Sequence, residues 1–297
     1  MTDNNSAWNP DEDYQYPLIM SGAGPFKYPD REDVDSVLPF VDLAVVGSIT
    51  KLPRKGNTPL HEKARLEYFE DPAYTINVHG MPNEGMHAIG PPRSPKLIIS
   101  LAEFSVDGFV EIYEHFAEWG AGTELNFGCP NTTEGIWCRK PESMDAVLSQ
   151  ITPRSGLTGV KLSPFLEEEY SLLQEGLAVI KQHSSKISYV VATNTLPGQT
   201  VTLSDGSSAV ETVEMGTQGG LGGEAIKELA LENATVCCQE LGGDVGVLLC
   251  GGVSSGKDLI KGLDVGCVGV QVVSAFLQQG PRVFKKIREE YLRSLLA

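Results

Sequence analysis

The chain has 297 residues and a mass of 32.0 kDa, close to the ~250 residues of a typical single (β/α) barrel. It carries 23 Lys and Arg residues against 39 Asp and Glu residues, a formal net charge of −16. A surface of this sign repels phosphate backbones and anionic lipid, which argues against a nucleic-acid or membrane partner. No apolar run approaches the ~20 residues of a membrane helix, and the N-terminus lacks the basic and apolar regions of a signal peptide. We therefore expect a cytoplasmic protein.

Apolar runs divide the chain regularly. Residues 1–16 are polar and acidic and are expected to form a flexible segment. From residue 17, apolar runs alternate with helical segments, of which the clearest cover about 107–119, about 166–182 and a stretch from about 141. The runs cover residues 17–21, 41–49, 96–100, 123–127, 156–162, 187–193, 245–250 and 266–273. Eight such runs with helices between them predict an α/β fold, a (β/α)8 TIM barrel, in one domain over 17–297.

Two insertions interrupt this alternation. Residues 52–95 are rich in Pro and Gly, and residues 196–217 contain Asp205-Gly206, a hairpin signal. Both follow the carboxyl ends of predicted strands. We therefore expect them to overhang the active-site face of the barrel, one forming a wall of the pocket and one protruding.

The fourth run ends in the turn Gly128-Cys129-Pro130-Asn131, and barrel enzymes carry their chemistry on such turns. Cys129 could be a nucleophile, a general acid or base, a metal ligand or a small buried residue. The six cysteines include no C-x-x-C pair, so neither a disulfide framework nor a structural metal site is expected.

Other polar residues and glycines follow the remaining runs. Lys51 and Lys161 come from two strand ends, and Gly251-Gly252 follows the seventh run. Glycines there allow backbone N–H groups to approach a phosphate, although a plain turn would have the same sequence. A phosphate site beside lysines and amides suits flavin mononucleotide, FMN.

Several motifs carry a family resemblance. They are Asn126-Phe127-Gly128-Cys129-Pro130-Asn131, Gly159-Val160-Lys161-Leu162-Ser163-Pro164, Thr193-Asn194-Thr195, the run from Gly219 to Lys227, and Cys250-Gly251-Gly252-Val253. In this order they resemble the class 1 dihydroorotate dehydrogenases, from about Ser21 to the C-terminus. The run Gly219-Gly220-Leu221-Gly222-Gly223 is most similar to subclass 1A. The resemblance implies an FMN barrel that oxidises dihydroorotate to orotate in pyrimidine biosynthesis, a homodimer, and fumarate as electron acceptor.

The resemblance also implies roles for individual residues. Cys129 corresponds to the base that removes the C5 proton while hydride leaves C6 for flavin N5. Lys51 corresponds to the lysine between flavin and substrate, and it belongs to the catalytic, substrate and cofactor sets. The other substrate residues are Asn77, Gly80, Met81, Asn126, Asn131, Asn194 and Thr195. The other cofactor residues are Ala23, Gly24, Ser100, Asn126, Lys161, Val191, Gly222, Gly251, Gly252, Val273 and Ser274.

The chain departs from the family pattern at three positions. His79 stands where Met is usual, Gly128 where Ser is usual, and Val273 where Gly is usual. His79 is either a polar addition to the substrate wall or a solvated loop histidine.

Three other functions compete with this interpretation. One is an FMN oxidoreductase acting on another unsaturated acid or ring. Another is a tRNA dihydrouridine synthase-like reductase, which the net charge of −16 disfavours. The third is a barrel that binds FMN or a phosphometabolite without turnover, which Cys129 and both lysines disfavour.

Overall fold

The structure is a computed structural model that describes residues 17–57, 67–68, 75–131, 135–200 and 218–296. Two expectations lie outside these residues, namely the flexible segment 1–16 and the hairpin at Asp205-Gly206. Among the described residues, no helix is long and apolar enough to cross a bilayer.

Eight parallel strands close into a barrel in the order β1-β12-β11-β8-β7-β6-β5-β2. They are β1 (Leu18–Ser21), β2 (Leu43–Ile49), β5 (Leu97–Leu101), β6 (Gly122–Asn126), β7 (Leu157–Lys161), β8 (Tyr189–Ala192), β11 (Gly246–Cys250) and β12 (Gly269–Val272). Each overlaps one of the eight predicted runs. The predicted (β/α)8 barrel is therefore confirmed, and the carboxyl ends of all eight strands meet at one end of it.

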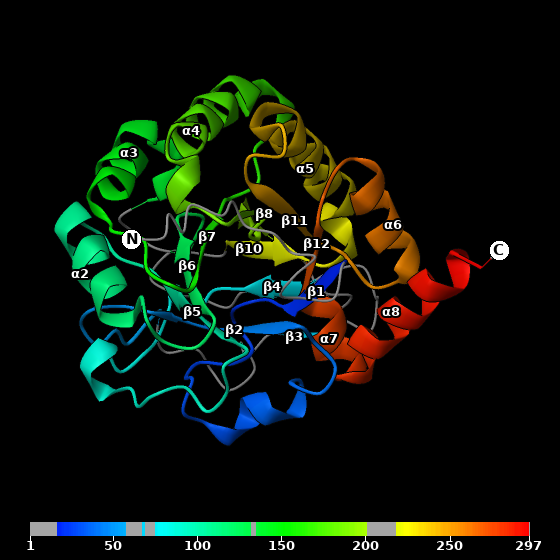
Figure 1. The fold of residues 1–297 in the computed structure, drawn as a ribbon, viewed down its shortest axis with the longest axis horizontal. Coiled ribbons are helices and arrows are strands. Elements are labelled where there is room, and N and C mark those ends of the chain that lie inside the picture. Colours follow the sequence, from blue (N-terminus) through cyan, green and yellow to red (C-terminus); the bar gives the residue numbers. More distant parts are fainter. Residues whose placement is uncertain (1–16, 58–66, 69–74, 132–134, 201–217, 297) are drawn as a thin grey trace, which may run out of the picture.

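Helices surround the barrel, as Figure 1 shows. They are α2 (Val106–Phe116), α3 (Pro141–Gln150), α4 (Tyr170–Gln182), α5 (Lys227–Leu241), α6 (Gly256–Asp264), α7 (Ser274–Gln279) and α8 (Arg282–Ser294). Local chemistry sets their first residues: the Ser105 hydroxyl accepts the Gly108 N–H ahead of α2, and Pro141 opens α3. Between β1 and β2 the chain instead forms a 3-10 helix, Glu32–Ser36.

Successive strand residues point to two different cores. Ile19, Ala44 and Val46 pack between the strands and the helices. Leu18, Met20, Leu43, Val45, Ile98, Tyr189, Val191, Leu248 and Cys250 form a separate cluster. This alternation is the period of two that a strand imposes on its side chains, and it identifies the separate cluster as the filling of the barrel. The barrel is therefore a packed core, and ligand space is left only at its open end.

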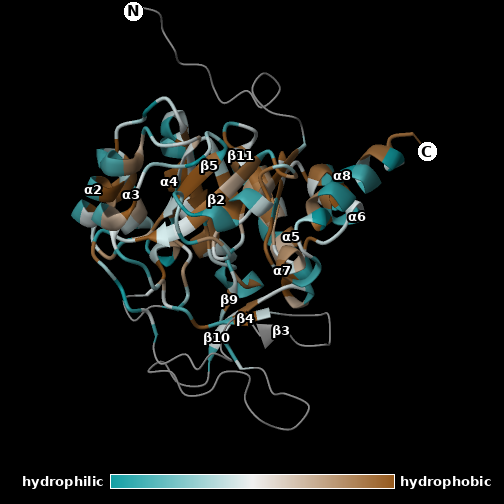
Figure 2. Ribbon diagram, turned by 90° about the horizontal axis from the view of Figure 1, so that it is seen from below, coloured by the Kyte–Doolittle hydropathy of each residue, from teal (hydrophilic) through white to brown (hydrophobic). Residues whose placement is uncertain are grey.

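A second sheet joins strands of the first insertion to one strand at the start of the second insertion and one strand just after it. Its strands are β3 (Glu67–Tyr68), β4 (Thr75–Asn77), β10 (Gly219–Gly222) and β9 (Leu196–Gln199), in the order β3-β4-β10-β9. Figure 2 shows this sheet lying across one end of the barrel. The strand β10 depends on glycine, because a Cβ at Gly219 would lie 2.8 Å from the Asn77 carbonyl oxygen and one at Gly220 would overlap the Thr195 hydroxyl.

A pair of glycine substitutions tests the packing of the barrel. A Cβ at Gly159 would overlap the ring of the fully buried Tyr189, so Gly159→Ala should lower the free energy of unfolding by about 1–3 kcal/mol. In α4, a Cβ at Gly176 would meet no atom closer than 3.8 Å, so Gly176→Ala should raise that free energy by about 0.5–1 kcal/mol. Urea unfolding of both variants measures the two effects. Equal stability of the two variants would contradict the packing described for β7.

Candidate active site

A cavity of about 1060 Å³, counted with its open mouth, lies at the carboxyl ends of the barrel strands. Its size falls in the range of small-molecule and cofactor sites. Its wall includes most of the residues that the sequence analysis selected: Ala23, Gly24, Asn77, Gly80, Met81, Asn126, Cys129, Asn131, Lys161, Asn194, Thr195, Gly222, Gly251, Gly252, Val273 and Ser274. The fold thus brings together side chains and glycines from the ends of seven of the eight barrel strands, all except β5, and from the second sheet.

Lys51 does not belong to this wall, and its interpretation as a cavity residue is wrong. Its ammonium pairs with Glu111 at 2.5 Å, and its side chain is 35% exposed. The cause is a register shift in the pairing of β2 with β5 between Gly47 and Ile49. Past this bulge, Ser48 faces the cavity while Ile49 packs in the outer core, so Lys51 also points outward.

Ser100 and Val191 do not line the cavity either. Ser100 is fully buried, and its hydroxyl is 2.8 Å from that of Ser48, which stands between it and the cavity. Val191 belongs to the filling of the barrel. At both positions a neighbouring side chain, and not Ser100 or Val191 itself, reaches the cavity. Ser100 and Val191 therefore lie in the buried layer beneath the residues of the cavity wall.

Lys27 is the cavity lysine that the sequence analysis missed. It lies six residues after the end of β1, within a loop, and none of the motifs that carry the family resemblance includes it. Burial lowers the pKa of Lys27, and attraction to Cys129 partly opposes this effect by raising the pKa. The sequence signal was available in Gly24-Pro25-Phe26-Lys27, where a lysine follows a Gly-Pro turn on the cavity side.

His79 also lines the cavity, which excludes the interpretation as a solvated loop histidine. Burial and repulsion by the Lys27 charge lower the pKa of His79 to about 4. The imidazole is therefore neutral at pH 7, and it offers the cavity one N–H donor and one nitrogen acceptor.

The four selected amides form two hydrogen-bonded pairs on the cavity wall. Asn194 donates to the Asn126 Oδ1 at 3.1 Å, and Asn126 donates to the Ser48 hydroxyl at 2.9 Å. Asn131 donates to the Asn77 carbonyl oxygen at 3.0 Å and also to its side-chain oxygen. Each amide is held in place by protein partners and keeps further hydrogen-bonding capacity for a planar polar ligand.

The two other cysteines near these strand ends differ from Cys129. Cys138 is fully buried, its sulfur accepts the Ser163 N–H at 3.2 Å, and burial raises the pKa of its thiol to about 12. Cys250 lies at the floor of the cavity, and burial raises the pKa of its thiol as well. Cys129 is partly exposed and interacts with Lys27. Of these three thiols, Cys129 is therefore the one suited to proton transfer.

Glycines form the other end of the cavity. Gly251 and Gly252 have φ values of +139° and +69°, which side-chain-bearing residues rarely adopt. A Cβ at Gly251 would lie 2.5 Å from that of Ala230, and one at Gly252 would lie 2.8 Å from that of Lys227. The turn therefore requires glycine in order to pack against α5, and both glycines line the cavity. A glycine turn of this kind can offer backbone N–H groups to a phosphate.

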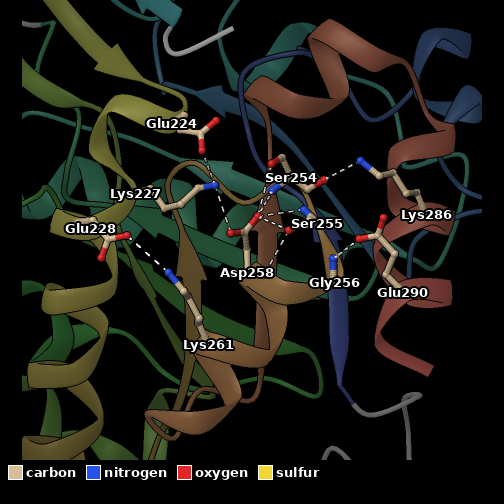
Figure 3. A network of polar contacts seen from close by, with 10 residues as sticks. All are labelled: Glu224, Lys227, Glu228, Ser254, Ser255, Gly256, Asp258, Lys261, Lys286 and Glu290. Carbon is tan, nitrogen blue, oxygen red and sulfur yellow. Dashed lines mark hydrogen bonds and ion pairs between the residues drawn. The ribbon is translucent and has the colours of Figure 1, made fainter. Parts of the chain in front are cut away.

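Figure 3 shows a polar network formed by residues that follow the glycine turns in the chain. The Asp258 carboxylate accepts the N–H groups of Ser254 and Ser255, each at 3.0 Å, and pairs with the Lys227 ammonium at 3.2 Å. Lys227 follows the turn that carries Gly223, whereas Asp258 follows the turn that carries Gly252. The pair thus ties the two glycine turns to each other. Burial by itself would raise the pKa of Asp258, but these donors outweigh burial and lower the pKa.

Asp258→Asn tests this network through the pH dependence of stability. Because the folded-state pKa is lowered, Asp258 stabilises the fold at pH values above its ordinary pKa of 3.8, and this stabilisation is lost as the pH falls through the folded-state pKa. Asp258→Asn should therefore lower the free energy of unfolding at pH 7 by about 1.5–3 kcal/mol. Urea unfolding across the acid range should show the variant and the wild type converging, while Asp264→Asn at the other end of α6 has little effect. A constant difference at all pH values would contradict the network.

Comparison with known proteins identifies relatives of the whole barrel. The chain is 29% identical to "Probable dihydroorotate dehydrogenase A (fumarate)" of Enterococcus faecalis, over 85% of this chain and 81% of that protein. It is 26% identical to "Dihydroorotate dehydrogenase (fumarate)" of Saccharomyces mikatae, over 83% of this chain and 79% of that protein. It is 28% identical to "Dihydroorotate dehydrogenase B (NAD(+)), catalytic subunit" of Methanopyrus kandleri, over 77% of this chain and 72% of that protein.

A solved structure shares the fold. It is the DHODH of Eimeria tenella in complex with ferulenol, which superposes with a TM-score of 0.73 at 18% sequence identity and covers 94% of this chain and 81% of that chain. The family model described as "Dihydroorotate dehydrogenase" matches residues 9–296. With nearly the whole chain matched, the protein belongs to the dihydroorotate dehydrogenase family, whose members are FMN-dependent flavoproteins.

Proposed function

We propose that this chain oxidises dihydroorotate to orotate, with Cys129 as the base and fumarate as the acceptor that reoxidises the flavin. The observation that carries the proposal is one cavity with two ends. One end holds Cys129, Lys27 and two amide pairs, and the other holds Lys161 and a glycine cradle. The family's cofactor and its substrate have this same division into a phosphate-bearing part and a planar acid.

The cradle residues fit FMN. Gly251 and Gly252 line the cavity and carry no side chain, so a phosphate can approach the backbone N–H groups of their turn. Lys161 reaches the cavity floor with a nearly buried ammonium. FMN, when bound, supplies an acceptor for the hydride that leaves C6 of the substrate.

The substrate end fits an anionic, planar pyrimidine. Asn126, Asn194, Asn131 and Asn77 can match the alternating donors and acceptors on the rim of such a ring. Lys27 supplies positive charge for a carboxylate in a protein whose net charge is −16. Cys129 takes the C5 proton, and the Lys27 ammonium beside it stabilises the thiolate form.

The acceptor and the assembly rest on similarity. The relatives include fumarate-type enzymes and an NAD(+)-type catalytic subunit. The run Gly219-Gly220-Leu221-Gly222-Gly223 favours fumarate, and the same resemblance supports a cytoplasmic homodimer. Among the described residues that line the cavity, no basic cluster of the kind that an RNA substrate would require is present.

His79 supports a second candidate substrate. It lines the cavity as a neutral imidazole beside Lys27. An FMN oxidoreductase for another unsaturated acid could use this donor and acceptor to bind a substituent that dihydroorotate lacks.

Anaerobic stopped-flow absorbance tests the proposed function together with the base. Dihydroorotate should bleach the flavin of the wild-type holoenzyme, and fumarate but not NAD should restore its absorbance. Because base catalysis typically supplies ~10²–10⁴-fold, Cys129→Ala should slow bleaching by that order while orotate still binds. Cys129→Ser should recover part of the rate only at high pH, since a hydroxyl loses its proton less readily than a thiol.

Two results would count against the proposal. A wild-type flavin that dihydroorotate leaves oxidised would exclude this substrate and favour the second candidate. Bleaching of Cys129→Ala at the wild-type rate would exclude Cys129 as the base.

A further inference from the structure

A chain of buried polar side chains crosses the barrel beneath the cavity. Glu124 lies in the middle of β6 and is fully buried. Its Oε2 accepts the Gln271 Nε2 at 2.6 Å and the Tyr189 hydroxyl at 3.2 Å. The Gln271 Oε1 in turn accepts the Lys161 ammonium at 3.2 Å. A single glutamine side chain thus bridges an acidic group on β6 and a lysine on β7.

The fold itself gives no reason for a carboxyl group at this position. The barrel filling around it is apolar, with Leu, Ile, Val and Met from the neighbouring strands. Within the described structure, the second carboxyl oxygen of Glu124, Oε1, has no hydrogen-bond partner. A buried acceptor without a partner is costly, and a well-packed apolar residue at such a position is often as stable or more stable. Glu124 therefore calls for a functional explanation.

The hydrogen bonds to Glu124 come from two other strands of the barrel. Both donors, Gln271 on β12 and Tyr189 on β8, converge on Oε2, and among the described residues Oε1 has no hydrogen-bond partner. The Gln271 amide then has one possible orientation, with its NH2 group toward the carboxylate and its oxygen toward the ammonium. The bridge therefore fixes the side from which the Gln271 oxygen accepts the hydrogen bond of the Lys161 ammonium.

Glycines keep the space that this chain occupies. A Cβ at Gly22 would lie 3.2 Å from the Gln271 Oε1, 3.6 Å from the Lys161 Nζ and 2.7 Å from a Val273 methyl group. A Cβ at Gly159 would overlap the Tyr189 ring that donates to Glu124. The backbone on both sides thus leaves room for the bridge. At the upper end of the bridge, Lys161 reaches the cavity floor.

We propose that Glu124 is a positioning residue that acts through Gln271: it holds the Lys161 ammonium at the cavity floor and lowers the reduction potential of the flavin bound there. The inference rests on the proposed function only in that FMN fills the cavity. Reduced flavin carries more negative charge than oxidised flavin, so a lysine raises the potential. A carboxylate bridged to that lysine engages part of its positive charge and lowers the potential.

Glu124→Gln is the direct test, because it keeps the shape and the acceptor oxygen but removes the charge. At an effective dielectric constant of about 20, removal of one of two charges about 10 Å apart changes an equilibrium constant by roughly tenfold. Binding of reduced relative to oxidised FMN should strengthen by that order, which raises the potential by about 30 mV for a two-electron couple. Equilibration of the holoenzyme with reference dyes measures this shift. Thr123→Val is the matched control, since Thr123 is the buried neighbour on the opposite face of β6.

Glu124→Asp distinguishes an effect of the bridge through Gln271 from an effect of the charge alone, and it serves as the test if Glu124→Gln does not fold. The shorter side chain keeps the charge but draws back from Gln271, so the reduction potential of the bound flavin should also rise in this variant. A reduction potential equal to that of the wild type in Glu124→Asp would show that Glu124 does not act through Gln271. A reduction potential equal to that of the wild type in Glu124→Gln would overturn the whole inference. A wild-type protein that takes up no FMN overturns the proposed function as well. If the wild type binds FMN and dihydroorotate bleaches it, but the reduction potential does not change in the variants, only this inference is overturned and the proposed function stands.

Discussion

The parallel closure of eight strands is the constraint on which the rest of the structure depends. Because all strands of the barrel run in the same direction, every carboxyl end reaches the same end of the molecule. Segments far apart in the chain, such as Lys27, Asn126 and Gly252, therefore line one cavity. The interior below is filled by apolar side chains and by the buried Glu124, Gln271 and Lys161, so the cavity lies above this filling. The second sheet then covers this end with β4 and β10 (Figure 2).

Close backbone approach is the second constraint, and glycine satisfies it at both ends of the cavity. Gly220 allows β10 to pass beside Thr195, and Gly252 allows its turn to lie against Lys227. The Lys227–Asp258 pair then fixes the two glycine turns relative to each other (Figure 3). The shape of the glycine cradle thus depends on its backbone, and the Lys227–Asp258 ion pair outside the cavity stabilises it. The end of the cavity that we propose for the substrate is instead formed by side chains.

The sequence predicted the barrel well because strands buried on both faces appear as uninterrupted apolar runs. Part of the cavity wall was predicted for a related reason, since the residue directly after such a run lies at the barrel mouth, and the family resemblance supplied the rest, including Asn77, Gly80 and Met81. Lys51 was misplaced because the bulge between Gly47 and Ile49 changes which residues face inward, and pattern alone does not reveal a bulge. Lys27 was missed because it reaches the cavity from within a loop. The strand β10 was missed because a run of glycines does not resemble a strand until its partner, β4, is known.

The central claim is that Lys27, and not Lys51, supplies the cationic side chain beside the substrate. The most direct measurement is the affinity of the holoenzyme for orotate, read from the change in the flavin spectrum, in Lys27→Met and Lys51→Met. Loss of a charge-assisted hydrogen bond costs about 1.5–3 kcal/mol, so Lys27→Met should bind orotate at least tenfold more weakly. Lys51→Met should bind it as the wild type does, because Lys51 pairs with Glu111 outside the cavity. The opposite result, with affinity lost in Lys51→Met and kept in Lys27→Met, would contradict the account.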